Sequence, residues 1–154
     1  MKTLSEILDA KGRNVWSVSP QNTAYEALEL MADKDVGALV VMDEGKLVGM
    51  FSERDYARKV ILKGKSSRET AVADVMTKPV CWVHPWSNLN ECMALMTNRH
   101  VRHLPVLDKD RLVGIVTIGD VVKAIISEQK SVIHELKGYV DEALKGRPEE
   151  NRKP

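Results

Sequence analysis

The 154-residue sequence repeats itself at an offset of 65 positions. Residues 15–61 align on residues 80–126 without a gap, and the identities fall at apolar positions, at turn residues and at one acid. They include Val15/Val80, Pro20/Pro85, Val41/Val106, Gly49/Gly114 and Asp55/Asp120. A fixed period with this distribution indicates a duplicated structural unit, so the chain is expected to fold as two copies of one motif.

Each copy predicts the same order of elements. A short strand, at 15–18 or 80–83, precedes a turn and a helix with one apolar face. Two apolar runs separated by a tight turn follow, and they predict a hairpin of strands at 38–42 and 47–51, and at 104–107 and 112–116. A second helix begins near Glu53 and near Ile118. The predicted fold class is α/β (α+β), with two β-α-β-β-α units.

One unit of about 50 residues buries too little apolar surface to be stable alone, so the two units should share an interface across a pseudo-twofold axis. The predicted division is a first repeat at 1–63, which opens with a helical segment, and a polar linker at 64–71. The second repeat, 72–146, ends in a long helix, and a charged tail occupies 147–154. The helix carries more apolar residues than one repeat needs, which predicts a homodimer formed through helices.

Bulk composition excludes several classes of protein. The net charge of +1 gives no global field for nucleic acid or acidic lipid, and no apolar stretch is long enough to cross a membrane. The opening MKTLSEILDAKGRN lacks the apolar core of a signal peptide, so we expect a cytoplasmic protein. Cys81 and Cys92 are expected to be buried free thiols. Motifs for phosphate loops, nucleophile elbows and zinc hydrolases are missing, so no enzyme is expected.

The strand-to-helix junctions carry the candidate chemistry. The first copy has Ser52 followed by Asp55, and the second has Thr117 followed by Asp120. A strand that runs directly into a helix presents free N–H groups and a positive dipole end, which favour anions. A carboxylate in the first turn can accept two hydrogen bonds from a ribose diol. The plainer interpretation is that S/T-x-x-D only caps a helix.

The motifs VADVMTKPV (72–80), RHLPVLD (102–108) and LVGIVTIGD (112–120) resemble a cystathionine-β-synthase (CBS) domain. The first copy follows with GALVVMD (37–43) and LVGMFSERD (47–55). Together they resemble a tandem CBS pair, or Bateman module, most like the small stand-alone bacterial proteins of this kind. The resemblance implies a regulatory module that binds an adenosine nucleotide such as AMP, ATP or NAD between the two copies.

In such modules the acid holds the ribose hydroxyls and the preceding Ser or Thr supports the phosphate. The resemblance assigns these roles to Asp55 with Ser52 and to Asp120 with Thr117. It places adenine against segments of the opposite copy. The Asp55 cleft would use Lys78, Pro79, Val80, Val101, Arg102 and His103, and the Asp120 cleft would use Arg13, Asn14, Val15, Val36, Gly37 and Ala38.

The two copies differ in charge. Arg54, Arg102 and His103 would all lie in the Asp55 cleft, so that cleft is expected to bind more phosphate charge. The alternatives are a solvent-facing salt bridge for Arg54 and a rim position for Arg102. No metal is expected: His100 and His103 have no nearby third ligand, and they are more simply a turn residue and a cleft-rim residue.

Three functions follow from these observations. The leading hypothesis is a sensor of AMP, ATP or NAD that signals through conformational or oligomeric change to an unidentified effector protein. The second is a dimerisation or partner-binding scaffold without a nucleotide. The third and weakest is nucleic-acid binding through the basic segment 54–65, which a solvated helix face explains more simply.

Overall fold

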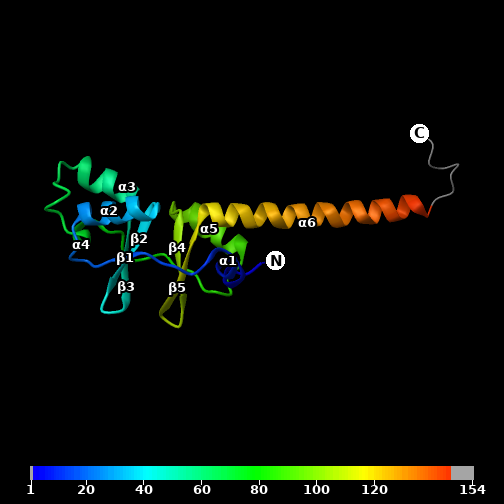
Figure 1. Cartoon of the computed structure of the whole chain (residues 1–154), viewed down its shortest axis with the longest axis horizontal. Coiled ribbons are helices and arrows are strands. Elements are labelled where there is room, and N and C mark those ends of the chain that lie inside the picture. Colours follow the sequence, from blue (N-terminus) through cyan, green and yellow to red (C-terminus); the bar gives the residue numbers. More distant parts are fainter. Residues whose placement is uncertain (1, 147–154) are drawn as a thin grey trace.

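The computed structural model describes residues 2–146 and consists of two similar halves followed by a long helix (Figure 1). The first half contains α1 (Leu4–Lys11), β1 (Ser17–Val18), α2 (Ala24–Lys34), β2 (Ala38–Asp43), β3 (Lys46–Ser52), α3 (Glu53–Asp55) and the π-helix η1 (Tyr56–Ile61). The second contains α4 (Val72–Val75), α5 (Leu89–Arg99), β4 (His103–Asp108), β5 (Arg111–Thr117) and α6 (Ile118–Lys145). The predicted tail at 147–154 lies outside the described residues.

The predicted hairpins and helices are confirmed, and the predicted leading strands are shorter than expected. In the first half, β1 pairs in parallel with β2 over two residues only, Ser17 and Val18. In the second half, the counterpart is a single parallel bridge between Val83 and Val106. The leading segment lies at the edge of each sheet, where only the residues opposite the middle of the hairpin join the ladder.

The two hairpins share their turn and their register. β2 and β3 are joined through Glu44 and Gly45, both at positive φ, and β4 and β5 through Lys109 and Asp110, also both positive. A two-residue turn with both central residues at positive φ is a type I′ turn, and its twist matches the twist of the two strands that it joins. Each hairpin also shifts register at the same place, after Val41 and after Val106. The repeat in sequence is therefore a repeat in backbone geometry.

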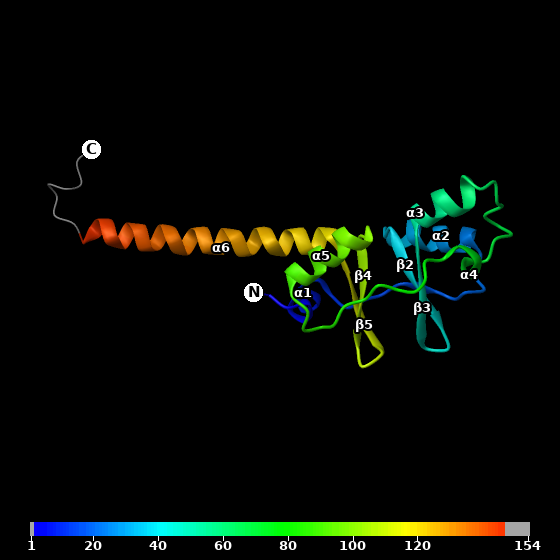
Figure 2. The same ribbon diagram turned by 180° about the vertical axis from the view of Figure 1, so that it is seen from behind.

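The two halves exchange their leading segments. Leu4, Ile7 and Leu8 of α1 are buried in the core of the second half, together with residues of α5, β4, β5 and α6. Val72 and Val75 of α4 are buried in the core of the first half, with residues of α2, β2 and β3. Figure 2 shows α1 in the second half, beside β5, and α4 in the first half, beside α2. Because each leading segment is buried in the core of the other half, the two halves form one body.

The repeated glycines of the LVG motif make this exchange possible. A Cβ on Gly114 would stand 2.7 Å from the Cδ atoms of Leu8, and a Cβ on Gly49 would stand 2.5 Å from Sδ of Met76. Each glycine therefore lets a segment from the other half lie directly on the hairpin. Among the described residues, no helix is long and apolar enough to span a membrane. Both cysteines are free, Cys92 buried and Cys81 half-buried.

Replacing Gly114 by alanine should destabilise the protein, because the buried Leu8 side chain must move. We expect Gly114→Ala to lower the free energy of unfolding by roughly 1–3 kcal/mol in urea titrations at pH 7. Gly138→Ala is the matched control: its Cβ meets nothing within 4 Å on α6. Alanine should there raise the free energy of unfolding, by roughly 0.5–1 kcal/mol. Equal effects of the two substitutions would contradict the packing of α1 on β5.

Candidate functional site

Both predicted acids lie in the first turn of a helix that continues directly from a strand. Ser52 caps α3: its Oγ accepts a hydrogen bond from the Asp55 N–H, and the Asp55 carboxylate accepts one from the Ser52 N–H at 3.0 Å. Thr117 and Asp120 form the same reciprocal pair at the start of α6. The capping role considered for S/T-x-x-D is thus real, and it fixes the direction of each carboxylate.

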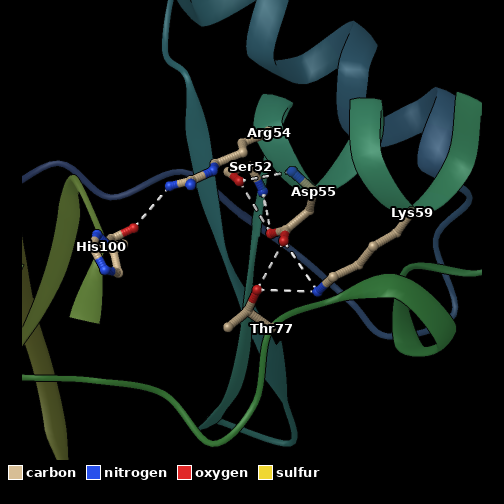
Figure 3. Close-up of polar contacts among 6 residues, drawn as sticks. All are labelled: Ser52, Arg54, Asp55, Lys59, Thr77 and His100. Carbon is tan, nitrogen blue, oxygen red and sulfur yellow. Dashed lines mark hydrogen bonds and ion pairs between the residues drawn. The ribbon is translucent and has the colours of Figure 1, made fainter. Parts of the chain in front are cut away.

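Asp55 also receives donors from outside its own turn (Figure 3). Its Oδ1 accepts a hydrogen bond from the Thr77 hydroxyl at 2.8 Å and lies 3.1 Å from the Lys59 ammonium. Lys59 stands one helical turn beyond Asp55, whereas Thr77 arrives from the segment that leads into the second repeat. Thr77 is held there by two backbone hydrogen bonds with Met50 of β3.

Asp120 has a related but different setting. Its Oδ2 accepts from the Lys11 ammonium at 2.5 Å, and Lys11 also donates to the Ile115 carbonyl. Burial of the Asp120 carboxyl raises its pKa, but the hydrogen bonds from Lys11 and Thr117 and the charge of Lys11 outweigh burial and hold the pKa below its ordinary value. Within the described residues the other oxygen, Oδ1, accepts no hydrogen bond. A ligand hydroxyl can therefore add there.

Lys11, Thr77 and Lys59 were not among the predicted site residues. The spacing of Asp55 and Lys59, four positions on a helix, is a sequence signal for an ion pair. Lys11 and Thr77 have no such signal, because they reach the acids only through the exchange of leading segments. Lys11 also corrects one prediction: the added basic groups do not all lie at Asp55, since Lys11 brings an ammonium to Asp120.

Arg54 connects the two halves instead of forming a salt bridge with Glu53. Its Nη1 donates to the His100 carbonyl at 2.9 Å, and His100 caps the end of α5 in the left-handed conformation (Figure 3). His100 is thus a turn residue. The guanidinium of Arg54 remains exposed beside the Asp55 turn, with further donors available to an anion.

Gly37 and His103, assigned by sequence to opposite sites, meet where the halves join. A Cβ on Gly37 would stand 3.7 Å from Cε1 of His103 and 3.6 Å from Oε1 of Glu53. Burial lowers the pKa of His103, the charges of Lys11 and Arg102 lower it further, and Asp120 opposes them. His103 was predicted for the Asp55 site; its charged neighbours place it close to Asp120 as well.

The remaining predicted residues fall into three groups. Val36 and Val101 pack against the two cores, and Ala38 is buried opposite Ser52 in the β2–β3 ladder. The Arg13 guanidinium bonds to Asp9 and Ser5 of the N-terminal helix. The others lie on the segments that flank Lys11 and Thr77, or beside His103; they are Asn14, Val15, Lys78, Pro79, Val80 and Arg102.

The other candidate chemistries receive no added support. Among residues 2–146 no group of three His, Cys, Asp or Glu side chains is placed to hold a metal ion. Trp16 lies under the Lys34 ammonium, 4.4 Å from the ring centre, and Trp82 and Trp86 both contact the His84 ring. Burial raises the pKa of the Cys92 thiol to about 11, which makes it unreactive at neutral pH.

Known proteins share this arrangement. A protein of Arabidopsis thaliana, "CBS domain-containing protein CBSX3, mitochondrial", is 36% identical over 148 residues, which cover 90% of this chain and 71% of that protein. A solved structure with CBS domains from Burkholderia ambifaria is 46% identical with a TM-score of 0.80, over 83% of this chain and 96% of that one. The CBS domain pair of MJ0100, in complex with 5′-methylthioadenosine and S-adenosyl-L-methionine, has the same fold with a TM-score of 0.73, at 23% identity over 83% of this chain and 98% of that one.

The repeats coincide with one family of domains. The family model for the CBS domain matches residues 4–61 and residues 72–127, which are the two halves of the fold together with their leading helices. The chain therefore belongs to the CBS-domain family and contains a tandem pair of CBS domains.

Proposed function

We propose that this CBS pair is a regulatory module that binds an adenosine nucleotide, AMP, ATP or NAD, beside Asp55 and Asp120. One observation supports it above the others: each carboxylate is oriented by its capping partner while a segment of the other half approaches it. This geometry occurs twice, at equivalent positions of the repeat. A helix cap alone would need no donor from the other half.

The chemistry of the two sites suits ribose and phosphate. A carboxylate accepts hydrogen bonds from adjacent ribose hydroxyls, and each of its oxygens has two lone-pair sites. The N-terminal N–H groups of α6 and the nearby ammonium of Lys11 favour an anion at Asp120. Arg54 and Lys59 supply positive charge at Asp55. Both sites therefore pair a ribose acceptor with a cation, although by different residues.

The fold is compatible with adenosine compounds, since the MJ0100 pair holds two of them. The family model that matches the chain is that of the CBS domain, and the function we propose is regulatory, with no reaction catalysed. Nucleotide binding would change the balance between two arrangements of the halves only if the nucleotide binds one of them more tightly. Arg54 donates across the junction to His100, so a phosphate that competes for this guanidinium provides such a difference.

Thermal unfolding with adenine nucleotides tests the proposal. At a nucleotide concentration of 100 times its dissociation constant, a ligand of the native state adds about 2.7 kcal/mol, which raises the melting temperature by roughly 5–10 °C in a domain of this size. We expect Asp55→Ala and Asp120→Ala each to remove part of the rise, and Asp33→Ala, on exposed α2 surface, to leave it unchanged. CMP serves as the control ligand with a different base. No rise with AMP, ATP or NAD would contradict the proposal and favour the scaffold.

The substitution Arg54→Gln tests whether the positive charge at the Asp55 site binds phosphate. Because a hydrogen bond to a charged group contributes about 1.5–3 kcal/mol, we expect ATP to bind roughly tenfold or more weakly and uncharged adenosine to bind almost as before. Isothermal titration calorimetry measures both. Arg58→Gln, an exposed arginine four positions along the same segment, should change neither affinity. An equal loss for ATP and adenosine would show that Arg54 acts on the fold and not on phosphate.

A further inference from the structure

The helix α6 extends far beyond the two CBS domains. Val121 and Ala124 are buried in the second core, and Glu128 accepts a hydrogen bond from the Lys2 backbone N–H. Every described residue from Gln129 onward is exposed. Figures 1 and 2 show the helix leaving the body as a single straight rod. The CBS-domain match ends at residue 127, so the projecting part is an addition to the family fold.

This projecting part has an apolar face that no described residue of the chain covers. Most helical stability in proteins comes from the packing of such a face. Ile133 is 52% exposed, Leu136 58% and Val140 57%. The described residues of the chain offer this face no partner, so a second molecule must cover it.

The apolar face follows a seven-residue repeat. Spacings of four and three alternate along it, which is the pattern of a coiled-coil seam. The first core position is occupied by Ile126, Ile133 and Val140, and the second by Val122, Gln129, Leu136 and Ala143. The first position is β-branched throughout and the second includes Leu136, and β-branched residues at the first position with leucine at the second favour two-stranded coils. Val132 and Tyr139 widen the face on one side.

Charged residues form two rows along the helix. Lys123, Lys130 and Lys137 each follow a second core position directly and border the seam, whereas Glu128, Glu135 and Glu142 lie on the outer face, behind Val132 and Tyr139. Two antiparallel helices packed through the seam bring the lysine row of one against the lysine row of the other, where like charges repel. Two parallel helices instead bring each lysine row beside the side that carries Val132 and Tyr139. The lysine row therefore favours a second copy of the same helix in parallel orientation.

A lipid surface fits the helix less well. Residues 121–145 contain four lysines and four acidic residues and have no net charge. Amphipathic helices that bind anionic membranes are instead rich in Lys and Arg on the polar face. The glutamate row would lie at the headgroup level, where it is repelled by anionic lipid.

We propose that α6 forms a parallel two-stranded coiled coil with α6 of a second copy, with its seam over residues 122–143. Gln129 faces Gln129 of that copy, and this polar pair fixes the register. The coil joins the two CBS pairs at the same end. Because Thr117 caps α6 and Asp120 lies in its first turn, the dimer seam and one candidate nucleotide site lie on one continuous helix.

Cysteine cross-linking tests the orientation in the full chain. Val122 and Ala143 occupy the same seam position three heptads apart. In a parallel coil, Val122→Cys and Ala143→Cys should each form a disulfide with the identical residue of the second copy under mild oxidation, whereas the wild type should form none. Antiparallel packing would leave each variant alone without a disulfide, and that result would overturn the proposal.

A second pair of variants tests the seam itself. Leu136→Glu puts a charge into the seam, and Ser131→Glu puts the same charge on the outer face. Analytical ultracentrifugation should show a dissociation constant at least about thirtyfold higher for Leu136→Glu, the loss of one interface hot spot, and little change for Ser131→Glu. The Ala143→Cys disulfide should likewise disappear only with Leu136→Glu. Equal cross-linking in both backgrounds, or a wild type that sediments as a monomer at every concentration measured, would overturn it.

Discussion

The structure depends on the crossing of two leading segments. Leu4 and Leu8 complete the second core and Val72 and Val75 complete the first, so neither CBS domain closes on its own residues. The same crossing carries Lys11 to Asp120 and Thr77 to Asp55. The crossing therefore both completes the cores and assembles the two candidate sites. A change that loosens α1 from β5 also removes the Lys11 ammonium from Asp120. Gly49 and Gly114 leave the space that both depend on.

The strand-to-helix junction serves two purposes at each acid. Ser52 and Thr117 end a strand, cap a helix and orient the carboxylate three residues later. A capping interaction that is worth about 1 kcal/mol to the helix thus also fixes the direction of the carboxylate. The settings then diverge, since Asp55 is approached by a hydroxyl and a lysine of its own turn, and Asp120 by a lysine from α1. The two sites need not select the same ligand.

Much of the fold could be predicted because it is local and repeated. The hairpins, their two-residue turns and the helix starts at Ser52 and Thr117 follow from short patterns that occur twice. The extent of the leading strands could not be predicted, because pairing at a sheet edge depends on the neighbouring hairpin. Lys11 and Thr77 were missed for a related reason: their partners are set by the crossing of segments far apart in sequence. Arg54 was singled out from the sequence, and its contact with His100 could not be predicted because it depends on how the halves join.

Nucleotide sites at Asp55 and Asp120 are the central claim, and a crystal structure of the chain grown with ATP, AMP or NAD tests it most directly. The account predicts electron density for adenosine with its ribose hydroxyls within hydrogen-bonding distance of the Asp55 or Asp120 carboxylate, and its phosphate toward Arg54 or Lys11. Density for the nucleotide elsewhere on the molecule, or unoccupied sites at millimolar ligand, would contradict it.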